Sequence, residues 1–271
     1  MKYPRSHRLP AFFMACLLCG ISISSALAVD VPNKKEIVTK ARQSYYNLHE
    51  LGLTGFRCDV NPNWDLAAAE VKKTDPAAAA NALKNMSMLR ISMSVGADNN
   101  AIVTKTELPG ADPQTANDRD VVFGGIRQMI TGFYQTTSVF ILGNPFPEVN
   151  GEYQLEDQAG QYRLAYRDSG VTAVIFMDKD LIISKMDITS TEFTSTLTPQ
   201  FIKNPKGLLL TGYVATYKGK TSADDIKLNV QITYQDVSGL QLPQKLNVSG
   251  TVSGTYVAQE IGFSGCQVTR K

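Results

Sequence analysis

The sequence contains few of the side chains from which most catalytic and metal-binding sites are built. It has two histidines, four cysteines and a single tryptophan in 271 residues. No GxGxxG or GxxxxGKS/T motif for binding nucleotide phosphates occurs. His49 is the only histidine after residue 28, so zinc and Ser-His-Asp chemistry lack material. We therefore expect no catalytic residue, no metal site and no cofactor, and a protein that is not an enzyme.

Two polar features have simple structural interpretations. His49 follows an expected helix, where a histidine suits the helix dipole. Asp178 and Asp180 lie in a short turn between two expected strands, and we interpret them as solvated turn residues instead of metal ligands.

The chain also lacks a basic block and a second long apolar run. Its formal net charge is +2, and three basic residues lie within the first eight positions. The remainder is close to neutral and offers no electrostatic attraction for nucleic acid or anionic lipid. No apolar run after residue 28 reaches the roughly 20 residues needed to cross a bilayer.

The first 28 residues have the order of a secretory signal peptide. Basic residues precede an apolar stretch over residues 9–23, and small residues end the segment at Ala28. We expect cleavage there, a mature chain of residues 29–271, and a periplasmic location. The alternatives are a retained membrane anchor, or lipid attachment at Cys16 or Cys19.

Only Cys58 and Cys266 remain after such a cleavage. Two cysteines in an oxidising compartment usually pair, so we predict a disulfide between them. The alternative is a pair of separate buried thiols.

Periodicity divides the chain into a helix-rich first half and a strand-rich second half. Apolar residues at helical spacing predict helices over residues 34–48, 64–73, 75–86 and 119–141. Alternating patterns predict strands over residues 56–60, 89–95, 102–108, 153–155, 162–166, 171–177, 181–188, 208–217, 226–234, 240–248, 251–257 and 261–268.

The alternation is cleanest over residues 226–234. It places the following side chains on one buried face: Ile226, Leu228, Val230, Ile232 and Tyr234. Such alternation is typical of an antiparallel sheet with one wet face, and roughly ten strands must curl or close. The sequence predicts an α+β fold, a curled antiparallel sheet or half-barrel with helices over its concave face or mouth. No linker or repeat divides residues 29–271, so we expect one domain.

A curled sheet with helices at its mouth is a natural container for an apolar ligand. Methionines, whose soft side chains adapt to variable apolar shapes, are frequent in the expected helices and strands. The residues that we expect to line such a cavity are Met93, Met129, Phe133, Leu164, Phe176, Leu228, Val230 and Ile232.

The helix predicted over residues 119–141 contains three glycines, Gly124, Gly125 and Gly132. Each costs roughly 1 kcal/mol relative to alanine in a helix. They indicate either a close approach of the helix backbone to the sheet or a helix soft enough to shift when a ligand enters.

The order of these elements resembles the LolA/LolB-like outer-membrane lipoprotein carriers, with RseB-like proteins as distant relatives. The resemblance rests on the segment Tyr234–Pro243, which has a "strand, short turn, GxxxP, strand" pattern, and on a helix leading into Phe56. Residues 89–108 lack the aromatic segment and DG turn of these carriers, and the helices over residues 64–86 are an insertion relative to them. The resemblance implies a half-barrel that shelters acyl chains, and Arg57 as the counterpart of a family arginine.

Three hypotheses of function follow. The first is a monomeric periplasmic carrier that binds a lipid, an acyl chain or a lipoprotein, and that exchanges it with an inner- or outer-membrane complex. The second is an envelope interaction protein whose core is filled by its own side chains. The third is an unrecognised hydrolase. An open apolar cavity would favour the first hypothesis over the second.

Overall fold

The computed structural model describes residues 29–107, 113–168, 170–220 and 225–271. The expected signal segment and the lipidation alternatives at Cys16 and Cys19 lie outside these residues.

The described chain forms a 13-stranded sheet in which every neighbouring pair of strands is antiparallel. The spatial order is β1-β5-β6-β7-β8-β9-β10-β11-β12-β13-β2-β3-β4. The strands are β1 (Val29–Asp30), β2 (Leu53–Pro62), β3 (Leu89–Val95), β4 (Ala101–Glu107), β5 (Tyr153–Gln158), β6 (Gln161–Asp168), β7 (Val171–Met177), β8 (Ile183–Thr189), β9 (Phe193–Asn204), β10 (Gly207–Gly219), β11 (Asp225–Val237), β12 (Leu240–Val252) and β13 (Thr255–Arg270). Because β1 and β4 are edge strands, the sheet does not close on itself.

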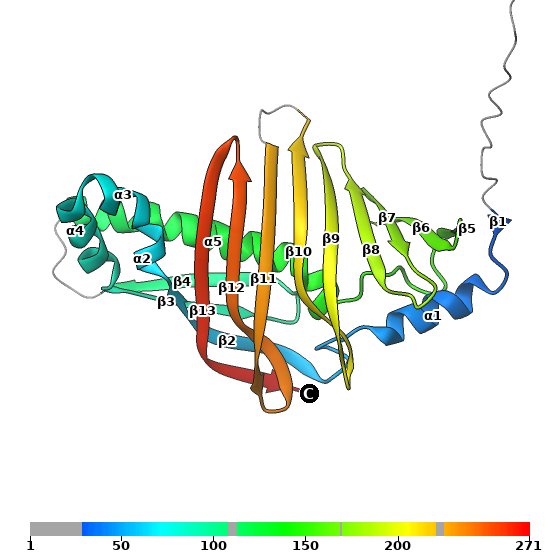
Figure 1. The fold of residues 1–271 in the computed structure, drawn as a ribbon. Helices are drawn as coiled ribbons and strands as arrows, with labels where there is room; N and C mark the ends of the chain where they lie inside the picture. Colours follow the sequence, from blue (N-terminus) through cyan, green and yellow to red (C-terminus); the bar gives the residue numbers. More distant parts are fainter. Residues whose placement is uncertain (1–28, 108–112, 169, 221–224) are drawn as a thin grey trace, which may run out of the picture.

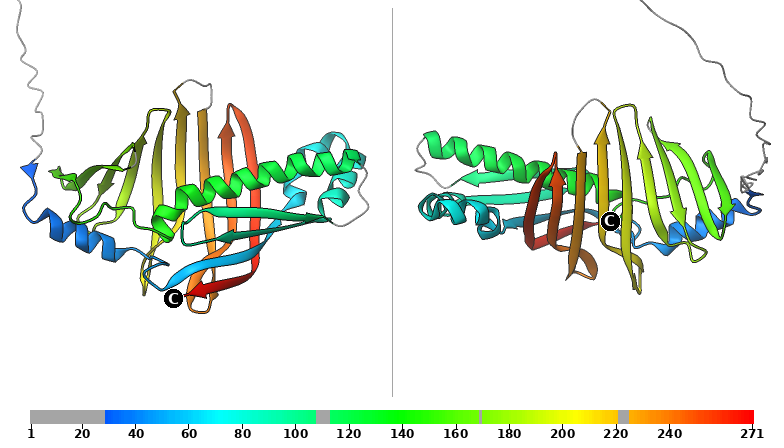
Figure 2. Two further views of the ribbon diagram at one scale, coloured as in Figure 1. Left: turned by 180° about the vertical axis from the view of Figure 1, so that it is seen from behind. Right: turned by 45° about the horizontal axis from the view of Figure 1, so that its top comes forward.

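Five helices accompany the sheet: α1 (Lys34–Ser44), α2 (Trp64–Ala67), α3 (Ala69–Thr74), α4 (Pro76–Met86) and α5 (Pro113–Ile141). The long helix α5 crosses one face of the sheet (Figures 1 and 2). Its first half extends beyond β13, where α2, α3 and α4 lie beside it, and α1 lies at the opposite end (Figure 1). The prediction of an α+β fold, a curled antiparallel sheet accompanied by helices, is therefore confirmed, and the helix on the concave face is α5.

The curl is produced largely where the two ends of the chain meet. β13 is 16 residues long and pairs first with β12 and then with β2. The register with β2 shifts between Ser264 and Gln267, and such a bulge bends and twists a strand. Beyond this bend, β2, β3 and β4 follow the direction of α5, whereas the other long strands cross it (Figure 2).

The disulfide between Cys58 and Cys266 is present and links β2 to β13 at this bend. Cys58 is buried and Cys266 packs against the core from a partly exposed position. The covalent link therefore fixes the first long strand to the last.

The alternation along β11 is confirmed. Val230 and Ile232 are buried, whereas Lys227, Asn229 and Gln231 are exposed. The core of the molecule lies on this inner face, between the sheet and α5.

Two strands were missing from the sequence prediction, the two-residue β1 and the long β9. β9 contains Pro199, and proline within an alternating run argues against a central strand. In the structure β8 pairs with β9 only as far as Leu197, so Pro199 has a strand partner, Tyr213 of β10, on one side only. A proline is tolerated because its missing N–H leaves no gap in a second ladder there.

Several boundaries also differ from the prediction, and α5 begins at Pro113 instead of residue 119. Segments 251–257 and 261–268 do not form two strands, because β12 continues to Val252 and one strand, β13, follows a short turn. Helix α1 ends at Ser44, well before the predicted boundary. Asn33 precedes α1 in a left-handed conformation and makes no side-chain cap. By contrast, Asp75 caps α4 through the amide of Ala78, as its position before Pro76 indicates.

A candidate ligand-binding groove

A groove of about 1400 Å³ lies between α5 and the concave face of the sheet. Its walls come from α5, from the inner faces of β6–β13 and from α2. We call it the α5 groove. It exceeds the roughly 300–1,000 Å³ typical of pockets for drug-sized molecules.

The helix wall follows from a seven-residue spacing along α5. Gly125, Gly132 and Val139 recur every two turns, and Met129 and Thr136 lie on the neighbouring row. From Gly125 to Val139 this wall is about 21 Å long at 1.5 Å per residue. It therefore exceeds the roughly 15 Å that an acyl chain spans in one leaflet, half of a hydrocarbon core about 30 Å thick.

The sheet wall consists of side chains from β6–β13, most of them at the alternate positions that face inward. Apolar side chains dominate it, and several are small, such as Ala173 of β7 and Ala215 of β10. Leu228 and Val230 of β11 lie in the same wall. Small residues on both walls leave space between α5 and the sheet that larger side chains would fill.

The three glycines of α5 do not mark a close approach to the sheet. A Cβ atom added at Gly124, Gly125 or Gly132 would meet no atom within 4 Å outside the helix. The first explanation of these glycines is therefore wrong. Gly125 and Gly132 lie on the wall of the groove, whereas Gly124 does not, so two of the three leave space for an occupant.

The polar groups of the groove are mostly neutral. Among the described residues that line it, the charged ones are Asp168 and Glu192, and none is a lysine, arginine or histidine. Burial raises the pKa of Tyr213, and the Thr136 hydroxyl partly opposes that rise. Burial, with Asp168 as a smaller cause, raises the pKa of Tyr166 to about 12. Both phenols are therefore protonated at neutral pH.

One end of the groove has exposed apolar side chains at its rim. Leu66 of α2, Val252 of β12 and Tyr256 of β13 line the groove there and are 39%, 36% and 69% exposed. The other end has Asp168, the last residue of β6, and Glu192, which precedes β9, and both are exposed. The groove is thus apolar at the α2 end and acidic at the β6 end.

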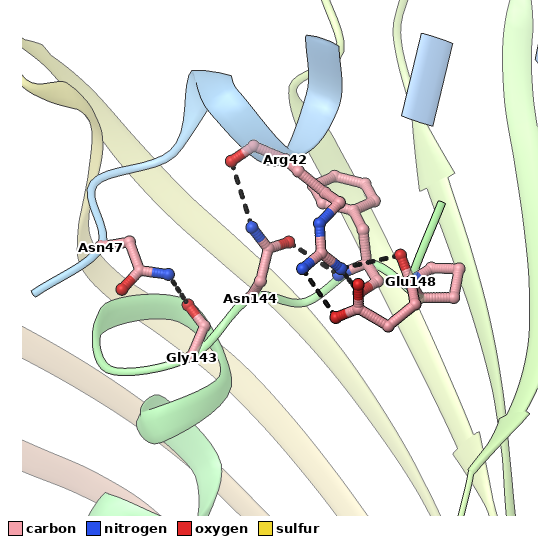
Figure 3. A network of polar contacts seen from close by, with 7 residues as sticks. Arg42, Asn47, Gly143, Asn144 and Glu148 are labelled. Atoms are coloured by element: carbon pink, nitrogen blue, oxygen red, sulfur yellow. Dashed lines mark hydrogen bonds and ion pairs between the residues drawn. The ribbon is translucent and has the colours of Figure 1, made fainter. Parts of the chain in front are cut away.

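The C-terminal end of α5 is held by a polar network with α1 (Figure 3). The Arg42 guanidinium donates to the carbonyl oxygens of Phe146 and Pro147 at 3.0 and 2.8 Å and to the Glu148 carboxylate at 2.8 Å. Asn144 returns a hydrogen bond from its amide to the Arg42 carbonyl at 3.1 Å. This network positions the segment that follows α5.

Asn47 adds a second link at the same end. Its amide donates to the Gly143 carbonyl at 2.8 Å, and its side-chain oxygen accepts from the backbone N–H of His49. The backbone N–H of Leu48 donates to Ile141, the last residue of α5, at 2.9 Å. One end of the helix wall is therefore fixed to the N-terminal segment.

Four of the eight residues expected around the cavity line the groove: Met129, Phe133, Leu228 and Val230. Met93, Leu164 and Ile232 are almost fully buried in the core and do not line the groove. Phe176 belongs to the opposite face of β7, where the Lys185 ammonium lies 5.0 Å from its ring centre. Its expected place in the cavity is corrected to the outer face.

Sequence reasoning missed the residues that make the groove open. Gly132 and Ala215 attract no attention in a search for large apolar side chains, although the helical glycines were a visible signal. Arg57, the expected counterpart of a family arginine, is exposed on the outer side of β2.

The remaining polar residues have structural roles. His49 does not end a helix, because four residues lie between it and Ser44, the last residue of α1. Its Nδ1 lies 2.8 Å from the Leu53 carbonyl oxygen and its Nε2 lies 2.6 Å from Asn99 Oδ1. Asp178 accepts from the backbone N–H of Ile182 within its turn. Within the described ranges, no group of three histidines, cysteines or carboxylates is arranged to hold a metal.

Over the same residues, no helix combines the length and the apolar character needed to span a bilayer. Comparison of the chain with models of protein families, with curated proteins and with solved structures finds no match. The relationship to the LolA/LolB-like carriers thus stays a prediction from sequence.

Proposed function

We propose that this protein is a periplasmic, non-enzymatic carrier of LolA-like shape that binds acyl chains or another elongated apolar ligand in the α5 groove. The observation that carries the proposal is the groove itself, an open space of about 1400 Å³ with mostly apolar walls. The hypothesis of a filled core predicts no such space. Transfer to and from an envelope membrane complex, with a lipoprotein or a free lipid as cargo, belongs to the same proposal.

The energetics of such a carrier depend on the length of the apolar wall. Each methylene group removed from water contributes roughly 0.8 kcal/mol. A chain lying along α5 contacts the wall from Gly125 to Val139. A chain that keeps part of its surface accessible to solvent in the groove binds less tightly than a fully buried one, and this favours release.

The exposed apolar rim at the α2 end suits the entry of such a ligand. Leu66, Val252 and Tyr256 extend the apolar wall to the surface. An amphiphile passing between a membrane and the groove keeps apolar contact along this path.

The test fills the groove without damaging the fold. Gly132→Leu places a side chain in the groove, and Gly124→Leu places the same side chain on the same helix outside it. Leucine is the better helix former by roughly 1 kcal/mol, so neither variant should melt below wild type. We expect Gly132→Leu to lose most of its binding of a neutral apolar fluorescent probe, while Gly124→Leu binds like wild type.

Equal binding by the two variants would place the probe outside the groove. Native mass spectrometry of the protein isolated from its own envelope gives the second readout. A co-purifying lipid whose signal disappears in Gly132→Leu supports the proposal. Absence of any probe binding by wild type would refute it and favour the envelope interaction protein.

A further inference from the structure

One of the hairpins beside the α5 groove differs from its neighbours in charge. The β6–β7, β8–β9, β10–β11 and β12–β13 hairpins have their connected ends on one side of the molecule, and each contributes residues to the groove wall (Figure 1). Three of these ends carry exposed charged residues, among them Asp168, Glu192 and Lys218. The β12–β13 hairpin, by contrast, contains no charged residue from Leu246 to Gln259.

The tip of the β12–β13 hairpin is exposed, and its backbone is paired up to the turn. Every residue over Thr251–Tyr256 is exposed. Val252 pairs with Thr255 across the hairpin, and the backbone N–H of Ser253 donates to the Asp225 carbonyl at 3.0 Å. Unpaired backbone groups are costly in an apolar phase, and paired ones are not. The tip therefore combines two properties of a segment that enters a membrane interface, the absence of charge and a hydrogen-bonded backbone.

Apolar side chains on and beside the tip continue the groove wall to the surface. Val252 and Tyr256 line the groove, as does Leu66 of α2, and all three are exposed. Tyrosine suits the boundary between water and lipid, because its ring is apolar and its hydroxyl is polar. An amphiphile that leaves a bilayer at this point meets an apolar surface without crossing water.

The size and the charge of this surface favour a lipid bilayer over a protein as its partner. A specific protein interface uses roughly 20–30 residues from each side, whereas the large exposed apolar side chains here are those of Leu66, Val252 and Tyr256. A bilayer requires no complementary shape and accepts apolar and aromatic side chains at its interface. The charged residues of β11 beside the tip, Asp225 and Lys227, have opposite signs, so they provide no net attraction for anionic lipid.

From these observations, and on the basis of the carrier function proposed above, we propose that the tip of the β12–β13 hairpin, with Leu66 beside it, docks the α2 end of the groove on a lipid bilayer. Insertion of apolar side chains drives the contact, because the strength of such binding scales with the apolar area buried in the interface. The contact is weak, reversible and nearly independent of salt, and it connects the apolar wall of the groove to the acyl region of the membrane.

The test is flotation of the mature chain with phosphatidylcholine vesicles and with vesicles that also contain about one fifth phosphatidylglycerol. We expect wild type to bind both with similar partition coefficients. Raising the salt concentration to about 0.5 M should change binding by less than about twofold, because screening acts on charge and not on apolar insertion. Binding that requires the anionic lipid and disappears in salt would show electrostatic adsorption and overturn the inference.

Two matched substitutions assign the contact to the tip. Thr255→Asp places a charge on the tip at an exposed residue that does not line the groove, and it should weaken vesicle binding about fivefold. Thr191→Asp places the same charge beside the β8–β9 tip, also exposed and outside the groove wall, and it should bind like wild type. Equal losses in the two variants, or no loss in Thr255→Asp, would overturn the assignment to the tip.

A fluorescence measurement locates the tip directly. Trp64 is the only tryptophan of the chain, so Tyr256→Trp adds a second one at the proposed contact. Vesicles with brominated acyl chains should quench Tyr256→Trp more strongly than wild type. Equal quenching would keep the tip out of the lipid and overturn the inference.

The outcomes separate the inference from the proposed function. Without vesicles, Thr255→Asp should bind the neutral apolar probe like wild type, whereas transfer of the probe from vesicles to this variant should slow by the factor that vesicle binding loses. Wild type that binds the probe but no vesicle overturns the inference and leaves the carrier function standing. Wild type that floats with vesicles but binds no probe overturns the carrier function instead. Self-association that Thr255→Asp abolishes, without vesicle binding, would assign the tip to a second copy of the chain and overturn the lipid surface.

Discussion

The two faces of α5 pack in different ways, although they belong to one helix. One face carries large side chains at helical spacing, among them Phe123, Ile130 and Tyr134, and all three are buried. The Tyr134 ring lies 6.0 Å from Phe56 of β2 and 6.5 Å from Phe263 of β13, between ring centres. We call this the packed face. The groove face carries glycine, threonine, methionine, valine and glutamine, with Phe133 as its one aromatic side chain.

The difference shows that side-chain volume, and not hydrophobicity alone, decides where a curled sheet leaves space. Both faces of α5 lie against apolar sheet residues. Interiors pack at the density of organic crystals, so the packed face leaves no room for a ligand. On the groove face, Gly125 and Gly132 contribute no side chain toward Ala173 and Ala215, and a cavity results.

The largest effect is expected where a charge is placed in the buried inner wall of the groove. Val230→Asp places a charge at a position that is 2% exposed. Without a cationic partner it should lower the free energy of unfolding by at least about 3 kcal/mol. Gln231→Asp, one residue on and exposed on the other face, should be nearly neutral. Chemical denaturation measures both, and similar effects would contradict the register of β11.

The next largest effect concerns the disulfide that fixes β2 to β13, the two strands whose phenylalanines contact Tyr134 of the packed face. Replacing both cysteines, Cys58→Ala and Cys266→Ala, removes a link across a sequence separation of 208 residues. We expect a loss of about 2–4 kcal/mol in the free energy of unfolding. A reductant should destabilise wild type but not the variant. Because the link is remote from the groove walls, probe binding at temperatures where the variant stays folded should persist.

The sequence allowed most elements of the fold to be predicted, because their periodicity is strong. β7 spans the predicted residues, and β11 has the expected inner face. β7 also explains the error at Phe176. Val174 and Phe176 on one side and Ala173 and Ile175 on the other are all apolar, so alternation does not indicate which face is inside.

The groove was less predictable from the sequence, because it is a volume that side chains leave unfilled and not a pattern of residue types. Large apolar residues such as Met93 and Leu164 fill the core, and their type does not distinguish a filled position from a cavity wall. Only the tertiary arrangement brings Gly132 of α5 and Ala215 of β10 to the walls of one groove, because the two are distant in sequence.

A smaller effect concerns alkaline pH and the groove tyrosine Tyr166. Its hydroxyl donates to the Pro145 carbonyl at 2.8 Å, and burial raises its pKa to about 12. The folded state therefore keeps a proton that the unfolded state loses near pH 10. The stabilisation is complete below pH 10 and is lost as pH rises toward 12.

Tyr166→Phe should therefore lose less stability between pH 10 and pH 12 than wild type does. Tyr256→Phe, at an exposed tyrosine on the rim, should follow wild type. Denaturation midpoints at several pH values from about 9 to about 12 measure the difference, taking about 10 as the ordinary pKa of the phenol. Parallel curves for all three proteins would show that Tyr166 does not carry this dependence. Other buried tyrosines with raised pKa values, Tyr45, Tyr134, Tyr213 and Tyr234, set the remaining slope.

The smallest effect distinguishes space from softness as the reason for glycine on the groove face. Gly125→Ala adds a methyl group that meets no atom within 4 Å, so a clash is not expected. The variant should gain roughly 1 kcal/mol in helix stability, which raises the melting temperature by about 2–4 °C in a chain of this size. Gly124→Ala should gain a similar amount and serves as the control outside the groove. If α5 shifts when ligand enters, both variants should slow release of the probe, because both stiffen the helix. If Gly125 only supplies room, release should change in Gly125→Ala alone, through tighter or looser contact with the probe. A melting temperature below that of wild type in Gly125→Ala would contradict the open geometry of the groove face.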